Sequence, residues 1–384
     1  MERTVELGKL ITQAKTVRCG NASYPVLSMT MHNGLVFQEE KFKKVIASKD
    51  TSDYKVVYRN QLVISFPIDE GVLATQRITE AGIVSPAYGI WDVDQSQILP
   101  EYLEYALRCN RAIQYYKAKL RGSTARRRSL PTPTLLAFKV PLPSIEKQHE
   151  ILTQIHRVRW IIGNREEQIS KLDDLIKARF VEMFGSNSSK VPLSDYCDVS
   201  GGYSFKSGDI TTDGAIRILQ IGNVSLNDVN WDTTNYLPKG YDDKYSRFLL
   251  NEGDIVVALT RPIIQSLGNV KACIVKAIDT PCLLNQRVGR ITLKKDMNTD
   301  LKYIFGCLMT EDFTRYVESC CIGCSQPNIS TKDIENYMIP AATSNEQKEF
   351  VRFSEQVDKS KAAVEAALNE TKILFGSMMQ EYFG

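Results

Sequence analysis

The sequence contains no long apolar run. No stretch approaches the roughly 18 uninterrupted apolar residues that a membrane-spanning helix needs. The first ten residues, MERTVELGKL, also lack the apolar core of a secretory signal peptide. Both absences argue against a membrane-embedded or exported protein. We therefore expect a cytoplasmic protein without a membrane partner.

Histidine is scarce, and cysteine is irregularly spaced. The nine cysteines form an odd set without regular spacing, which is typical of reduced thiols rather than of a disulfide framework. Cys321 and Cys324 have the spacing of half a zinc site, but a structural site needs two more ligands. The three histidines all precede residue 157. We therefore expect no metal site.

Motifs that carry catalysis are missing as well. The sequence has no Asn-Pro-Pro-aromatic or Asp-Pro-Pro-Tyr segment, so it shows no adenine methyltransferase site. It also lacks a Walker phosphate loop and the GxGxxG fingerprint of dinucleotide-binding proteins. The glycine-rich segment 201–206 has neither spacing. We expect no catalytic residue and no cofactor in this chain.

The composition that remains is that of a globular protein. Apolar residues make up 43% of the 384 positions and charged residues 24%, which is enough for two or three domains with ordinary cores. The formal net charge of +3 permits nucleic-acid binding without requiring it. The clustering of charge therefore has to decide the question.

The chain repeats itself at an offset of about 200 residues, which is the most informative feature of the sequence. The offset is 193 upstream, 201 in the middle and 199 downstream, so loops differ in length while the order of segments is kept. The matching pairs include Asn60–Ser65 with Gly253–Ala258, Tyr102 with Tyr303, Leu107 with Leu308, Gly122 with Gly323, and Val140-Pro141 with Ile339-Pro340.

The strongest part of the repeat predicts two long helices, over residues 144–185 and 343–384. Apolar residues recur at alternating steps of four and three from Ile151 to Met183, and the second copy keeps this register at an offset of 199. Ser144 is a candidate N-cap, and Thr343 with Glu346 predicts a capping box. Each helix of roughly 40 residues would be about 60 Å long.

Two such helices in tandem can pair antiparallel as a coiled coil, with the globular parts related by a pseudo-twofold axis. The alternative is that each helix packs separately on its own domain. The second copy has Ser354, Lys361 and Thr371 at positions where the first has apolar residues, so we expect looser pairing there or a need for a partner. Off-stripe apolar residues also predict a face that a partner protein covers, namely Leu152, Trp160, Ile161, Leu175 and Phe180.

The remaining segments, residues 1–143 and 186–342, are predicted to be two mixed α/β domains. Strand-like runs include 62–66, 216–219, 254–259 and 270–275, and one helix is expected over 100–120 with a counterpart over 300–320. The fold class is therefore α+β, with two globular domains separated by two long helices.

A polar loop follows the paired helices in both copies, and the two loops differ in chemistry. Three adjacent arginines in the first loop suit phosphate contact and bidentate reading of guanine, and the amides in the second suit adenine. The alternative is a pair of solvated turns. The candidate DNA contacts in these loops are Arg121, Ser123, Thr124, Arg126, Arg127, Arg128, Ser325, Gln326 and Asn328.

Further candidate DNA contacts lie elsewhere in both globular parts. Asn285, Gln286 and Arg287 place two amides and a guanidinium in one short segment. The other candidates are Arg59 and Arg77 in the first part and Lys206, Arg261 and Gln265 in the second.

The duplicated arrangement resembles the specificity subunits of Type I restriction-modification systems. The resemblance covers nearly the full length. It rests on the segment 140–148, VPLPSIEKQ, at the start of the first helix, on 172–185, LDDLIKARFVEMFG, at its end, and on the weaker second entry segment 338–347, MIPAATSNEQ.

The resemblance implies a non-catalytic subunit with two target recognition domains, each of which reads one half of a split site in double-stranded DNA. It also implies that the helices set the unread gap and dock two modification subunits. Those subunits would carry S-adenosylmethionine, and restriction subunits would supply ATP- and magnesium-dependent cleavage. Two alternatives stay open: the specificity portion of a single-chain restriction enzyme, and a coiled-coil scaffold that binds only protein.

Overall fold

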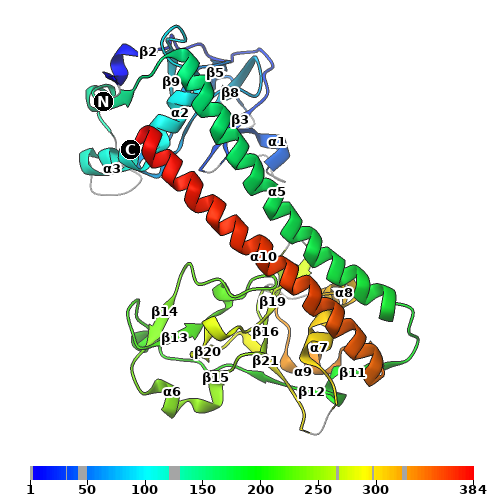
Figure 1. Ribbon diagram of the computed structural model, residues 1–384. Coiled ribbons are helices and arrows are strands. Elements are labelled where there is room, and N and C mark those ends of the chain that lie inside the picture. The colour runs from blue at the N-terminus through cyan, green and yellow to red at the C-terminus, as the bar shows by residue number, and fades with distance from the viewer. Residues whose placement is uncertain are drawn as a thin grey trace. The chain divides into compact units, whose positions relative to one another are not determined.

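The computed structural model describes residues 3–31, 33–41, 50–120, 130–264, 268–295, 298–321 and 327–384 (Figure 1). The chain divides into two compact units, and each is described by itself. The first unit comprises residues 1–166 with 366–384, and the second comprises residues 167–365. Two 40-residue helices, α5 (Ile145–Phe184) and α10 (Ser344–Phe383), contribute to both units.

The first unit is built on a four-stranded antiparallel sheet in the order β2-β9-β6-β7. Three antiparallel strand pairs accompany it: β1 with β10, β3 with β4, and β5 with β8. The bounds are β1 (Thr4–Glu6), β2 (Ile11–Gln13), β3 (Leu27–Thr30), β4 (Gly34–Phe37), α1 (Gln38–Lys41), β5 (Lys55–Tyr58), β6 (Leu62–Ile64), β7 (Leu73–Thr75), β8 (Ala81–Val84), β9 (Gly89–Val93), α2 (Pro100–Arg108), α3 (Asn110–Lys119), α4 (Thr132–Leu136) and β10 (Lys139–Pro141).

The second unit has a sheet in the order β12-β21-β16-β19 and another in the order β14-β13-β20-β15, in which β13 and β20 are parallel. Two strand pairs complete it, β11 with β22 and β17 with β18. The bounds are β11 (Lys190–Pro192), β12 (Cys197–Gly201), β13 (Ile216–Leu219), β14 (Asn235–Leu237), α6 (Tyr241–Lys244), β15 (Leu249–Leu250), β16 (Ile255–Ala258), β17 (Ile263–Ile264), β18 (Asn269–Val270), β19 (Ala272–Ile274), β20 (Cys282–Leu284), β21 (Val288–Leu293), α7 (Leu301–Leu308), α8 (Glu311–Cys320), α9 (Thr331–Asn336) and β22 (Met338–Pro340).

The repeat seen in the sequence is a repeat of elements. The order β2-β9-β6-β7 in the first unit matches β12-β21-β16-β19 in the second, and α2, α3 and α4 match α7, α8 and α9. The ladders also match, because Ile64 faces Gly89 as Val257 faces Gly289. The single helices predicted over 100–120 and 300–320 were wrong, because each is two helices: α2 with α3, and α7 with α8. Cys109 between α2 and α3 is extended, with φ −66° and ψ 162°, and such a residue cannot continue an α-helix.

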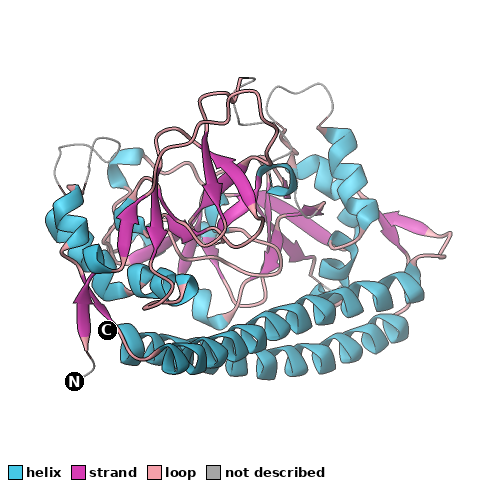
Figure 2. Cartoon of the chain, turned by 90° about the horizontal axis from the view of Figure 1, so that it is seen from above, coloured by secondary structure: helices cyan, strands magenta, loops and turns pink. Residues whose placement is uncertain are grey.

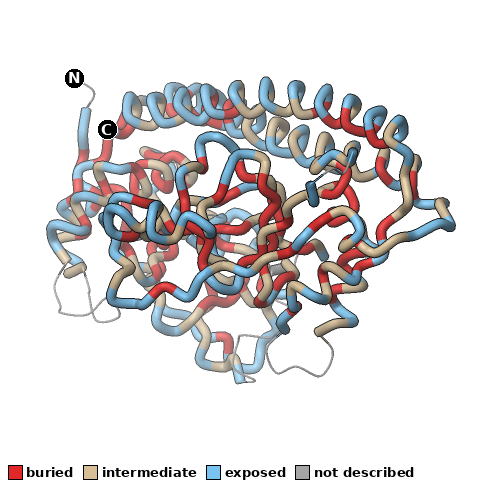
Figure 3. The backbone as a smooth tube through the Cα atoms, turned by 90° about the horizontal axis from the view of Figure 1, so that it is seen from below, coloured by how far each residue is buried: buried red, intermediate tan, exposed pale blue. Residues whose placement is uncertain are grey.

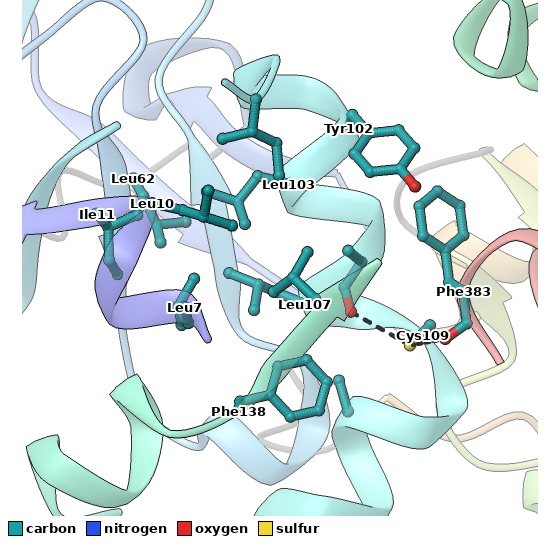
Figure 4. Close-up of a cluster of buried hydrophobic side chains, with 14 of the residues drawn as sticks. Leu7, Leu10, Ile11, Leu62, Tyr102, Leu103, Leu107, Cys109, Phe138 and Phe383 are labelled. Atoms are coloured by element: carbon teal, nitrogen blue, oxygen red, sulfur yellow. Dashed lines mark hydrogen bonds between the residues drawn. The ribbon is translucent and has the colours of Figure 1, made fainter. Parts of the chain in front are cut away.

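The end of α10 completes the core of the first unit (Figure 4). The Phe383 ring lies 5.0 Å from that of Tyr102, and Arg111 Nε donates to the Phe383 carbonyl over 2.9 Å. In the second unit, Phe184 at the end of α5 packs 5.2 Å from Tyr303 in the same way. Each long helix therefore ends with a buried phenylalanine that packs on a buried tyrosine.

The two long helices run antiparallel within each unit (Figure 2). In the first unit Tyr382 donates to Gln154 over 2.6 Å, and in the second Lys361 pairs with Asp173 at 2.7 Å. Polar contacts also fill the heptad positions where looser pairing was expected, since Arg165 donates to Thr371. Lys361 and Thr371, which replace apolar residues of the first copy, therefore have polar partners across the helix pair.

The predicted uncovered face of the helices is smaller than expected. Leu152 and Phe180 are buried in the cores of the first and second units. Trp160, Ile161 and Leu175 are exposed, as expected. Among the described residues, no helix combines the length and apolar character that crossing a membrane requires.

Candidate nucleic-acid interface

Nine of the candidate DNA contacts lie outside the described residues. They are Arg121, Ser123, Thr124, Arg126, Arg127, Arg128, Gln265, Ser325 and Gln326. The remaining candidates divide between the two units.

Five candidates of the second unit come together at one end of the β16–β21 ladder, and Lys206 lies three residues after Tyr203, which is bonded to this edge. We call this set the polar edge: Lys206, Arg261, Asn285, Gln286, Arg287 and Asn328. Backbone hydrogen bonds connect its segments. Leu259 N donates to Arg287 O, Arg261 N to Pro327 O, and Gln286 N to Tyr203 O, each over 2.8 Å. Thr260 and Asn328 also form an antiparallel bridge. The fold thus gathers residues from four separate stretches of sequence.

Gly202 allows the first of these segments to approach the rest. A Cβ atom at this position would lie 2.1 Å from the Asn285 carbonyl oxygen, which no side chain can tolerate. The residues after β12 can therefore lie directly against 284–286, where Tyr203 N donates to Leu284 O over 3.0 Å. Gly202, which fits no phosphate-loop spacing, thus has a packing role.

Arg261 and Arg287 are held in an unfavourable backbone conformation. Their φ angles are 47° and 71°, in the left-handed region, which costs a residue other than glycine about 1–2 kcal/mol. The other two described non-glycine residues with positive φ are Asn60 and Asn227, a residue type that tolerates this region. Both arginines are exposed, and neither forms an ion pair with any described residue.

Asn285 lies in the same edge but is buried, with 8% of its surface exposed. Its Oδ1 atom has no hydrogen-bond partner among the described residues. A buried amide oxygen without a donor is unfavourable by about 1–3 kcal/mol, so such an atom calls for an explanation.

Arg59 and Arg77 of the first unit have carboxylate partners. Arg59 pairs with Glu80 at 2.6 Å and donates to the Arg77 carbonyl over 3.0 Å. Arg77 pairs with Glu101 at 2.8 Å and lies 3.6 Å from Glu104. These contacts give both guanidinium groups a structural role at the junction of β7 and α2.

The candidates in the two units also lie at opposite ends of the matching sheets. Arg261 follows β16 and Arg287 precedes β21, whereas Arg59 precedes β6 and Arg77 follows β7. The equivalent of Arg77 at an offset of 199 is Lys276, which pairs with Asp228 at 3.2 Å and is not part of the polar edge. The sequence candidates in the two units therefore do not form equivalent surfaces.

Tyr203 is a residue of this region that sequence reasoning missed. It is 38% exposed and adjoins Asn285 and Gln286 through the backbone. A side-chain hydrogen bond with Tyr245 raises the pKa of Tyr203. The available signal was the Gly201-Gly202 pair directly before an aromatic residue, which indicates a close backbone approach.

The described side chains show no metal cluster, and two buried thiols are held in their protonated form. No group of three or more His, Cys, Asp or Glu residues among them is placed to hold a metal ion. Burial raises the pKa of Cys197 and Cys282 to about 12, so both thiols stay protonated near neutral pH.

Comparison with known proteins places this domain in a family. Residues 186–371 match the family described as the Type I restriction modification DNA specificity domain. The chain is 32% identical over 239 residues to the Type I restriction enzyme MjaVIII specificity subunit of Methanocaldococcus jannaschii, and this match covers 58% of the chain. It is 32% identical over 152 residues, or 39% of the chain, to the Type I restriction enzyme EcoAI specificity subunit of Escherichia coli.

These matches span 55% of the MjaVIII subunit and 25% of the EcoAI subunit. Solved structures extend the likeness in fold to the whole chain. A chain from a type I R-M system aligns with a TM-score of 0.52 at 16% identity, covering 99% of this chain and 97% of its own length. The S subunit from M. genitalium aligns with a TM-score of 0.50 at 11% identity, covering 100% and 96%. Residues 186–371 therefore match a Type I restriction modification DNA specificity domain, and the chain is similar to specificity subunits of Type I restriction enzymes over part of their length.

Proposed function

We propose that this chain is a non-catalytic subunit that reads DNA for a Type I restriction-modification complex, and that the polar edge of the second unit reads one half-site. The observation that carries the proposal is the pair Arg261 and Arg287. Both are exposed, unpaired with any described carboxylate, and held at positive φ on neighbouring strand ends. Strained conformations of this kind cluster at binding sites, where function outweighs the loss of stability.

The chemistry of the polar edge suits the major groove of DNA. Arginine binds guanine O6 and N7 with two hydrogen bonds, and the amides of asparagine and glutamine bind adenine N6 and N7 in the same way. Lys206 can contact a phosphate, which positions the protein without reading sequence. The edge therefore combines groups for both bases with a group for the backbone.

The first unit would read the other half-site. Its frame repeats that of the second unit, and the sequence candidates of residues 121–129, which lie outside the described residues, come after α3 in the chain as those of residues 325–328 come after α8. A helix of 40 residues at about 1.5 Å per residue is about 60 Å long, which can hold two readers about one DNA turn, 34–36 Å, apart. The length of α5 and α10 would then set the unread gap.

The exposed apolar residues of the helices would dock two modification subunits. Trp160 is 69% exposed and Ile373 is 70% exposed, and Leu175 and Leu374 are exposed at equivalent positions 199 residues apart. Figure 3 shows exposed turns along both long helices. Exposed apolar clusters of this kind mark protein interfaces. The modification subunits would hold S-adenosylmethionine, and restriction subunits would hold ATP and magnesium.

Mapping methylated adenines tests this function. The chain is expressed with an adenine-methylating modification subunit from its own organism, and methylated positions are read across the host genome. We expect one split motif, and we expect that exchanging residues 186–342 for those of another specificity subunit changes only one half of it. A change in both halves would contradict the two-reader arrangement.

The same preparation tests the alternatives. Incubating the purified chain alone with labelled S-adenosylmethionine and DNA should give no methyl transfer. Methyl transfer by the chain alone would identify it instead as part of a single-chain enzyme. If the chain binds its partners but neither it nor the complex binds DNA in a salt-dependent manner, the protein is a scaffold.

A further inference from the structure

An aromatic cluster stands beside the polar edge of the second unit. The Tyr203 ring lies 4.7 Å from that of Tyr245, 5.0 Å from that of Phe205 and 5.3 Å from that of Phe248. Lys244 Nζ lies 5.2 Å from the Tyr245 ring centre. Three neighbouring rings therefore hold Tyr203 in place.

The position of Tyr203 ties this cluster to the polar edge. Tyr203 and Asn285 are partners in a parallel bridge, and Gln286 N donates to Tyr203 O over 2.8 Å. Phe205 is buried beneath the cluster, whereas Tyr203 is exposed over 38% of its surface. A large aromatic ring is thus presented to solvent next to two amide side chains.

The hydroxyl of Tyr203 is already engaged. Tyr203 makes a side-chain hydrogen bond with Tyr245, and the partly exposed ring offers apolar carbons to a ligand. Among the base edges of the major groove, the C5 methyl of thymine is the apolar group that such a ring can contact. A rigid ring loses little conformational entropy on binding.

We propose that Tyr203 is a specificity-determining residue whose ring packs on the C5 methyl of a thymine in the half-site read by the second unit. The neighbouring exposed amide of Gln286 would read adenine, the base that pairs with thymine. Together these groups favour A·T pairs at one position or at adjacent positions. This assignment rests on the proposed function and adds to it one residue and one base.

The alternative is that Tyr203 only covers the apolar cluster around Phe205. If Tyr203 only covers the cluster, DNA affinity should not depend on a thymine methyl. If Tyr203 contacts a thymine, it should. Burying one methyl group contributes a factor of about four in affinity. The contact can therefore be detected by removing that single methyl from the DNA.

The experiment is a thymine-to-deoxyuridine scan. The full-length chain is titrated with duplexes that carry the mapped site, with one thymine at a time replaced by deoxyuridine, which lacks the methyl. We expect the affinity of the wild-type chain for DNA to fall about fourfold when one particular thymine is replaced. That thymine should lie in the half-site that changes when residues 186–342 are exchanged. Tyr203→Ala should bind the unmodified site about fourfold more weakly and should no longer respond to that replacement.

Tyr203→Phe is the matched control, because it keeps the ring and removes only the hydroxyl. It should retain both the affinity and the deoxyuridine response of the wild type. The wild-type scan needs no folded variant, so a scan without effect in that half-site overturns the proposal even if Tyr203→Ala does not fold. A deoxyuridine response that persists in Tyr203→Ala overturns it as well. Either of these two results would leave sequence-specific DNA binding intact. A complete loss of sequence-specific binding in the wild type would instead refute the proposed function.

Discussion

The two copies of the repeat share a frame, but the charges at their helix junctions are reversed. In the first unit Glu101 on α2 lies 2.9 Å from His156 on α5 and 2.8 Å from Arg77. Lys302 on α7 occupies the matching position of the second unit and pairs with Asp358 on α10 at 2.6 Å. Exposed pairs of this kind contribute less than about 1 kcal/mol each. The difference shows that the buried contacts define the common frame, while polar positions are free to diverge.

The largest expected effect tests the common frame. Phe383→Ala and Phe184→Ala each remove a fully or almost fully buried ring, so each should lower the free energy of unfolding of its unit by about 3–5 kcal/mol. Urea denaturation of the full chain measures both. Ile373→Ala, at a position 70% exposed, is the control and should change stability by less than about 0.5 kcal/mol. If only one of the two substitutions lowers the free energy of unfolding strongly, the two copies do not share this buried contact.

The helix pair differs between the copies at Lys361, whose equivalent in α5 is Ile162. Asp173→Ala should destabilise the second unit by about 1.5–3 kcal/mol, because it leaves the largely buried Lys361 ammonium without its partner. Lys361→Ile combined with Asp173→Ala should recover most of that loss, since the first copy already has isoleucine there. Thermal unfolding measures both variants. If the double variant is as unstable as Asp173→Ala alone, the Lys361–Asp173 ion pair does not account for the difference between the two copies.

The third prediction separates the arginines of the two units. Arg261→Gly and Arg287→Gly should each weaken DNA binding by about 1–3 kcal/mol. Both should leave stability unchanged or raise it by up to about 1 kcal/mol, because glycine adopts positive φ freely. Arg77→Ala should do the reverse, with reduced stability and unchanged DNA affinity, because Glu101 and Glu104 hold its guanidinium. Salt-dependent DNA titration and thermal unfolding of the same samples decide between these outcomes.

The smallest effect concerns Asp254, whose equivalent at an offset of 193 is Gln61, which does not titrate. Burial raises the pKa of Asp254 above its ordinary value of 3.8. A raised carboxyl pKa contributes stability that is fully present below pH 3.8 and lost as the pH rises through the folded pKa. Asp254→Asn should remove this slope and change stability near neutral pH by less than about 1 kcal/mol. Unfolding curves between pH 4 and 7 measure how the free energy of unfolding depends on pH. If that dependence is the same in Asp254→Asn as in the wild type, a group other than Asp254 causes it.

The sequence predicts the long helices well because local signals define them. Each begins and ends within one residue of the predicted bounds, and the capping box forms as expected, with Thr343 N donating to Glu346 over 2.8 Å. Heptad spacing and caps act over a few residues, so a single sequence contains them.

The polar edge could be predicted only as separate candidates. Backbone pairing between Leu259 and Arg287 and between Arg261 and Pro327 brings them together, and sequence spacing carries no record of such long-range contacts. The carboxylate partners of Arg59 and Arg77 were missed for the same reason. The positive φ of Arg261 and Arg287 also has no sequence signal, since arginine is not a residue that favours it.

The buried end of α10 also constrains how the protein is made. The Cys109 thiol of the first unit contacts the Phe383 carbonyl across 274 positions of sequence. The first unit is therefore discontinuous, and a ribosome must translate the entire second unit before the first can close its core. Contacts so distant in sequence slow folding. During synthesis the first unit exposes the apolar surface around Tyr102 and Cys109, which makes this interval the period when the nascent chain most needs a chaperone.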